Sequence, residues 1–95
     1  MIAQVLNTSA PVPFTDETRT FIAEVTAKAR QADGCEGILV LVDPNTGNGL
    51  AINMFRDEAA AHAFDARRQE LTKEAQEQVG ATVGEPQHYE VFANL

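Results

Sequence analysis

The sequence predicts an α+β fold in which a four-stranded antiparallel sheet carries two helices on one face. Residues 38–42, ILVLV, are all apolar and residues 50–55, LAINMF, are apolar except for Asn53. Seven residues of turn chemistry, DPNTGNG, join them, which is typical of a β-hairpin. A segment with helical periodicity lies on each side of this hairpin, and a strand-like segment lies near each end of the chain. With right-handed crossovers, the order βαββαβ gives a ferredoxin-like sandwich, here a single domain spanning residues 1–95.

The first strand is expected at residues 2–8, where Ile2, Val5 and Leu6 alternate loosely with polar residues. Residues 9–13, SAPVP, then interrupt regular structure, because two prolines in three residues exclude both a helix and a sheet ladder.

The first helix is predicted to begin after Thr15, a suitable N-cap, with Asp16 and Glu17 in the turn where acidic side chains are favoured. Gly34 is predicted to end it, since glycine adopts the left-handed conformation that follows many helices. Its apolar stripe is Phe14, Thr18, Phe21, Ile22, Val25, Ala29 and Ala32.

The strand at residues 38–42 is apolar at every position. An antiparallel strand with one wet face alternates apolar and polar residues, so both faces of this strand are expected to be buried. Because the helices cover only one face, a second copy of the chain is expected to cover the other. The sequence therefore predicts a homodimer formed through the sheet face.

The second helix is predicted at residues 57–80, with Asp57 as its N-cap, Gly80 as its stop and a possible break near Leu71 and Thr72. A loop at 81–86 and a last strand at 87–93 complete the chain. The apolar stripe of the helix is Ala60, Phe64, Leu71, Ala75 and Val79.

The composition argues against several classes of partner. The net charge is −7 and no basic cluster exceeds Arg67 and Arg68, which disfavours nucleic acid and anionic membranes as partners. Cys35 is the only cysteine, so neither an internal disulfide nor a cysteine-rich metal site is expected. No segment resembles a signal peptide or a membrane span, which predicts a cytoplasmic protein.

Residues 33–43, DGCEGILVLVD, resemble the PGFEGLLVLVD segment of the antibiotic biosynthesis monooxygenase (ABM)-like superfamily. The similarity continues through residues 46–47, 49–52, 55–59 and 89–91. It implies a dimeric α+β barrel in which two sheets pack face to face. Some members of this superfamily are cofactor-independent monooxygenases of aromatic, polyketide-like substrates, others degrade haem, and many small members have no established activity.

The haem-degrading branch carries an Asn on the first strand, a Trp at the end of the third and a His on the second helix. Asn7 could match the Asn, but Phe55 stands where the Trp would be and Asp65 where the His would be. Two of three positions therefore depart from that branch, and no cofactor is predicted.

Asn7 and Asn53 are candidate catalytic residues, because each is a polar residue in an otherwise apolar strand. Asn53 shares a strand face with Ala51 and Phe55, and on that face it could point into a cavity between sheet and helices. A buried amide there could hydrogen-bond a substrate carbonyl or polarise an enolate. The plainer alternative is an amide that bonds neighbouring backbone or faces solvent.

His88 and Tyr89, on opposite faces of the last strand, are candidates for proton transfer. The alternatives are an exposed edge histidine and an interface or core tyrosine. Phe21, Phe55 and Phe64 are expected to line an apolar pocket, although such aromatic residues more often fill a core.

His62, Glu58 and Asp65 lie together on the wet face of the second helix and could bind a divalent metal. A solvated set of charges is far commoner, so no metal site is predicted. Cys35 is interpreted as a small buried thiol rather than a nucleophile.

Three functions remain open at this point: a monooxygenase acting on a small aromatic or polyketide-like substrate, a non-catalytic module that binds a small apolar or aromatic ligand, and a structural or regulatory homodimer. An open interior into which polar groups converge would favour the first two. An interior filled by phenylalanine rings would favour the third.

Overall fold

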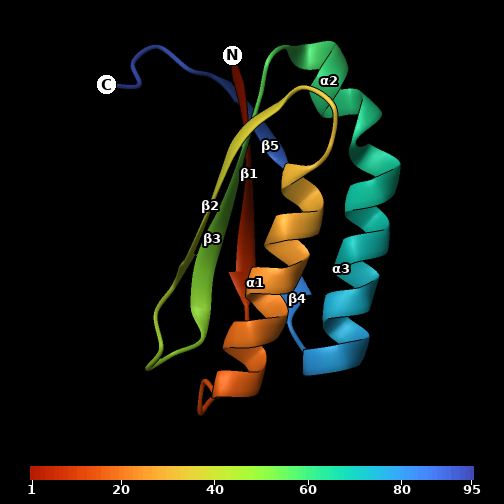
Figure 1. Cartoon of the computed structure of the whole chain (residues 1–95). Coiled ribbons are helices and arrows are strands. Elements are labelled where there is room, and N and C mark those ends of the chain that lie inside the picture. The colour runs from red at the N-terminus through yellow and green to blue at the C-terminus, as the bar shows by residue number, and fades with distance from the viewer.

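A sheet and a layer of helices make up the computed structural model, which describes residues 1–95. The helices cover one face of the sheet and leave the other bare (Figure 1). The elements are β1 (Ile2–Ser9), α1 (Asp16–Arg30), β2 (Cys35–Val42), β3 (Asn48–Phe55), α2 (Glu58–Ala63), α3 (Asp65–Val79), β4 (Thr82–Val83) and β5 (Gln87–Glu90). The predicted ferredoxin-like α+β fold is confirmed. No helix has the length and apolar character that crossing a bilayer requires.

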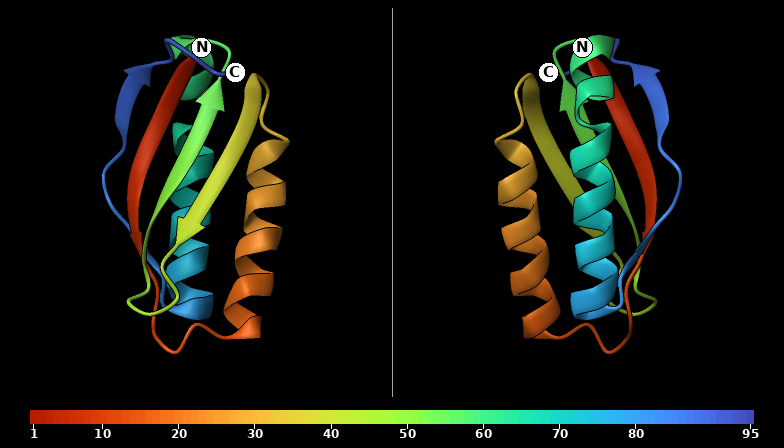
Figure 2. Two further views of the ribbon diagram at one scale, coloured as in Figure 1. Left: turned by 90° about the vertical axis from the view of Figure 1, so that its left-hand side faces the viewer. Right: turned by 90° about the vertical axis from the view of Figure 1, so that its right-hand side faces the viewer.

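β1 lies in the interior of the sheet. It pairs antiparallel with β3 on one side and with β4 and β5 on the other, and β2 completes the far edge beyond β3. Figure 2 shows β2 and β5 at opposite edges of the twisted sheet. The register places Gln4 of β1 opposite Asn53 of β3 and also opposite His88 of β5. This alignment brings three polar residues from distant parts of the chain into one row.

The helix that follows β1 begins as predicted. Thr15 is its N-cap and accepts a hydrogen bond from the backbone N–H of Thr18 at 3.2 Å. Its C-cap, however, is Gln31, and Gly34 lies in the turn beyond it with φ +80°. A Cβ at Gly34 would lie 2.6 Å from the Cβ of Ala60, so this turn requires glycine for close approach as well as for its conformation.

The second predicted helix is interrupted at Phe64, not near Leu71 and Thr72. The backbone N–H of Phe64 bonds the carbonyl groups of both Ala60 and Ala61, so the six-residue α2 tightens and ends there. The Phe64 ring then packs against Phe55 with ring centroids 5.3 Å apart. Leu71 is instead buried in the middle of the continuous helix α3.

The other differences lie at the ends of strands. The last strand ends at Glu90 rather than at residue 93, and the predicted loop at 81–86 contains the two-residue strand β4. β4 forms because the second half of β1 extends past β5 and has a free edge for Thr82 and Val83 to pair with.

The closely packed part of the core lies at one end of the helix–sheet interface. Phe55 is fully buried at the end of β3 and belongs to a cluster that includes residues of all three helices and the first residue of β2. The cluster consists of Ala29, Cys35, Phe55, Ala60, Ala61, Phe64 and Leu71.

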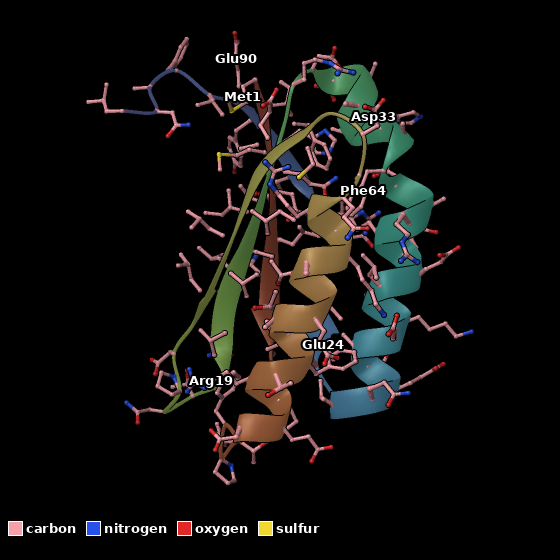
Figure 3. The ribbon with its side chains drawn as sticks, viewed as in Figure 1. Met1, Arg19, Glu24, Asp33, Phe64 and Glu90 are labelled. Atoms are coloured by element: carbon pink, nitrogen blue, oxygen red, sulfur yellow. The ribbon has the colours of Figure 1, made fainter.

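The outer face of the sheet is apolar and uncovered. Side chains project from it away from the helices (Figure 3). Leu39, Leu41 and Tyr89 remain about half exposed on this face, whereas Ile38, Val40 and Val42 face the helices. In a single chain, therefore, only one face of the strand at residues 38–42 is covered.

Candidate functional site

Two adjoining cavities lie between the sheet and the helices. The first has a volume of about 110 Å³ and the second of about 120 Å³. Since an apolar cavity of about 150 Å³ can hold a benzene ring, the joined space suits a small aromatic molecule. The two cavities share the lining residues Val25, Thr26, Val40, Ala51, Ala75 and Val83.

Asn53 supplies a polar group to the first cavity. It is only 7% exposed, and its Nδ2 donates a hydrogen bond to Gln4 Oε1 at 3.1 Å. No protein group donates to Asn53 Oδ1, yet every fully buried side-chain oxygen and nitrogen has a partner. Asn53 Oδ1 is therefore not fully buried, and because Asn53 lines the first cavity this oxygen is available to a ligand there.

Three further side chains connect Asn53 to the surface. The fully buried Gln4 places its Nε2 3.3 Å from His88 Nε2, and His88 Nδ1 lies 2.9 Å from Glu58 Oε1. Because the Gln4 amide nitrogen can only donate, His88 Nε2 accepts and the ring proton resides on Nδ1, where it is donated to Glu58. We call Asn53, Gln4, His88 and Glu58 the polar chain.

Each member of the polar chain is held by a different element. Gln4, Asn53 and His88 stand side by side on the helix-facing side of β1, β3 and β5. Glu58 is the first residue of α2, and Asp57 caps this helix by accepting the backbone N–H of Ala60 at 2.9 Å. That hydrogen bond, aided by the neighbouring Arg56, holds the pKa of the Asp57 carboxyl below its ordinary value.

Arg68 of α3 also lines the first cavity. Its side chain is 15% exposed, and its only polar contact is a long one of 3.5 Å from Nε to Asp65 Oδ1. A guanidinium group has five N–H donors, so most of them remain free at or near the cavity. The site thus offers an acceptor at Asn53 and a permanent cation at Arg68.

The structure separates the predicted site residues into two groups. Asn53 and His88 belong to the polar chain. Asn7 is exposed on the outer face of the sheet, opposite Leu50, and Tyr89 is 53% exposed there, with its hydroxyl donating to Gln87 Oε1 at 2.8 Å. Neither Asn7 nor Tyr89 lines the cavities.

The three phenylalanines expected to line a pocket also differ. Phe64 lines the first cavity and Phe21 the second. Phe55, in contrast, is completely buried against Phe64 and lines neither.

The side chains weighed as a metal site do not converge. His62 Nδ1 lies 3.5 Å from Asp65 Oδ2, while Glu58 contacts His88 instead. Cys35 is buried, and its Sγ lies 3.8 Å from the carbonyl oxygen of Gly37.

Gln4 and Arg68 were not predicted as site residues, although the sequence around each indicates its position. Gln4 lies two residues from both Ile2 and Leu6, so it shares their strand face. Arg68 lies four residues after Phe64 and three before Leu71, which places it on the apolar stripe of its helix. A polar residue in register with apolar neighbours is a candidate for a buried site.

No family model matches the chain, and no curated protein matches it. Among solved structures, one similar in fold is a candidate antibiotic biosynthesis monooxygenase from Deinococcus radiodurans, with 21% identity, coverage of 100% of this chain and 96% of that one, and a TM-score of 0.75.

Two other solved structures also resemble the chain in fold. SnoaB, a cofactor-independent oxygenase from Streptomyces nogalater solved with one asparagine replaced by alanine, has 14% identity, coverage of 99% and 95%, and a TM-score of 0.72. A Nitrosomonas europaea protein of unknown function has 17% identity, coverage of 99% and 91%, and a TM-score of 0.73. The chain has the α+β fold of antibiotic biosynthesis monooxygenases over its whole length, and at these identities the similarity establishes fold alone.

Proposed function

We propose that this protein belongs to the ABM-like superfamily and is a cofactor-independent monooxygenase of a small hydroxylated aromatic compound. One observation carries the proposal: Asn53 lines an apolar cavity between sheet and helices, and its Oδ1 accepts no hydrogen bond from another protein group. A ligand in the cavity can therefore donate a hydrogen bond to this oxygen. A ring hydroxyl is a ligand that matches both the shape and the polarity of this site.

In the proposed reaction the substrate supplies all the electrons. A hydroxyaromatic ring and O₂ give a quinone and water, so one oxygen atom enters the ring and the other leaves as water. The ring C–H and O–H bonds break, and the four electrons that reduce O₂ come from the substrate.

The residues at the cavity have distinct roles in this scheme. Asn53 Oδ1 accepts the hydrogen bond of the ring hydroxyl and so orients the ring. The Arg68 guanidinium stabilises the anion that develops as the ring hydroxyl gives up its proton, which ends on the water formed from O₂.

The proposed enzyme is a homodimer formed through the outer face of the sheet. Support comes from the apolar side chains that this face leaves uncovered in one chain, among them Leu39 and Leu41, each about half exposed. Contiguous apolar patches of this kind mark interaction surfaces. A second copy with the same apolar face is the occupant proposed here.

Oxygen consumption with 1-naphthol tests the proposal. We expect uptake of O₂ with formation of the quinone by the purified protein, and a loss of about 100-fold in kcat/KM for Asn53→Ala. Asn7→Ala is the matched control, because it removes the same side chain from the exposed outer face. Saturable binding of 1-naphthol without O₂ uptake would instead establish a non-catalytic binding module, and equal losses in both variants would refute the role of Asn53.

A further inference from the structure

We propose that His88 acts as a specificity switch: its protonation state determines whether Asn53 presents an acceptor or a donor to the cavity. Neutral His88 then selects ligands with a hydroxyl donor, and protonated His88 selects ligands with a carbonyl acceptor. The inference rests on the proposed function in that the cavity binds an aromatic ligand, and it names what sets the class of that ligand.

With His88 neutral, the hydrogen bonds of the polar chain all run in one direction. Asn53 Nδ2 donates to Gln4, Gln4 Nε2 donates to His88 Nε2, and His88 Nδ1 donates to Glu58. The free end of the chain at the cavity is the oxygen of Asn53.

Protonation of His88 makes both ring nitrogens donors. His88 Nε2–H then faces the N–H of Gln4 across 3.3 Å, and two donors cannot bond. Because Gln4 is fully buried, its amide cannot hydrogen-bond to solvent instead, so two donors facing each other here carry a large free-energy cost. Rotation of the Gln4 amide by half a turn removes the mismatch by presenting Oε1 to His88.

The same rotation passes along the chain to the cavity. With its oxygen turned toward His88, Gln4 presents Nε2–H to Asn53, and Asn53 must rotate in turn to accept with Oδ1. Its NH₂ group then faces the cavity. Terminal amide torsions are two-fold and the amide oxygen and nitrogen are nearly the same size, so both rotations preserve the packing around these buried side chains.

The surroundings of His88 allow it to exchange protons with solvent. The His88 side chain is 28% exposed and that of Glu58 67%, and Glu58 can accept from Nδ1–H in either state. Glu58 is the only ion-pair partner of His88. The other charged groups at this end of the molecule are Asp57 and Arg56 before α2, the Met1 ammonium group at the start of β1, and Glu90 on the same face of β5.

Arg68 and Asp65 are the charged groups beside the cavity itself. The guanidinium group remains a donor at every pH at which the protein is folded, so it contributes equally to both states of the switch. A change in ligand preference with pH therefore reports the polar chain.

The switch separates the substrate of the proposed reaction from its product. A hydroxyaromatic ring can donate to the Asn53 oxygen, whereas a quinone can only accept. Neutral His88 is therefore the state that retains substrate and disfavours product.

The first test uses the ligand-free protein and is independent of the proposed function. NMR signals of the Gln4 and Asn53 side-chain amides and of the His88 ring are followed from about pH 5 to about pH 8, the range in which imidazole titrates. We expect all three sets to shift with one midpoint. His88→Gln should abolish the amide shifts, and His62→Gln, at the other histidine, should leave them unchanged.

The second test measures affinities for phenol, acetophenone and toluene over the same range. The ratio of phenol to acetophenone affinity should rise about fivefold or more from low to high pH, since one hydrogen bond is exchanged for a mismatch. The rise should persist in His62→Gln and vanish in His88→Gln. Toluene, which neither donates nor accepts, should bind equally at all pH values.

The outcomes separate the two proposals. The proposed switch would be overturned if the Gln4 and Asn53 amide signals stayed constant while the His88 ring signals shifted with pH. It would also be overturned if the ratio of phenol to acetophenone affinity in the wild type did not change with pH. Absence of toluene, phenol and acetophenone binding would overturn the proposed function, while the NMR titration would still decide the switch.

Discussion

Gln4 and Asn53 are buried amides that bond each other, and Gln4 also bonds His88. These hydrogen bonds offset the free-energy cost of burying the two amides. Gln4→Met should destabilise the protein by about 1–3 kcal/mol, because it leaves Asn53 Nδ2 without its acceptor. Asn53→Leu should destabilise it by a similar amount, because it leaves Gln4 Oε1 without its donor. The double variant should lose clearly less than the sum of the two, because no orphaned amide remains between them.

Urea denaturation of the four species measures this coupling. Asn7→Leu is a suitable control, because this exposed amide should change the free energy of unfolding by no more than about 0.5 kcal/mol. Additive losses in the double variant would show that the Gln4–Asn53 bond contributes nothing of its own.

For these side chains the sequence indicated Asn53 and His88 separately, but not Gln4, which joins them. An amide within an apolar strand is visible from its neighbours alone. The contact between Gln4 and Asn53 spans 49 positions and that between Gln4 and His88 spans 84, so both depend on strand register. Asn7 looked equivalent to Asn53 because the loose alternation at residues 2–8 did not show which face is covered.

Among the elements, the hairpin between β2 and β3 depends on Gly47. This residue has φ +79°, and a Cβ added to it would overlap the carbonyl oxygen of Ala10, whose N–H donates to the Gly47 carbonyl at 2.8 Å. Gly47→Ala should therefore reduce the free energy of unfolding by about 2 kcal/mol or more.

Gly84→Ala provides the control for this prediction. A Cβ there would meet only ordinary contacts, with the carbonyl oxygen of Asn7 at 3.5 Å. Thermal or urea unfolding that shows equal losses for the two variants would contradict the importance of the Gly47 contact.

Element order and type could be predicted because each strand and helix carries its own periodicity and end signals, such as Thr15 before α1 and Gly80 after α3. The interruption at Phe64 could not be predicted, because this residue keeps a right-handed helical conformation and no glycine or proline lies beside it. At this position the Phe64 ring packs against Phe55, a tertiary contact that the sequence does not show.

For the molecule as a whole, the bare sheet face is an uncovered apolar surface on which Leu39, Leu41 and Tyr89 are each about half exposed. If two copies pack through it, Leu39→Glu should convert the dimer to a folded monomer, because it places a charge within an apolar interface. Sedimentation equilibrium at micromolar concentration measures the mass, and circular dichroism confirms the fold. Glu36→Gln, exposed on the same strand but outside the apolar patch, is the control. A wild-type monomer would refute the homodimer.

The position of β1 between β3 and β5 has a consequence for the synthesis of the protein. The polar chain joins residues 4, 53, 58 and 88, so β1 is synthesised before β5 and Gln4 gains its second partner only after His88 has been made. Until His88 has emerged and β5 has paired, Gln4 has only Asn53 to bond and the row behind the cavity lacks its third member. A nascent chain that already contains α1, α2, α3 and the β2–β3 hairpin therefore still lacks the complete polar chain until β5 pairs with β1.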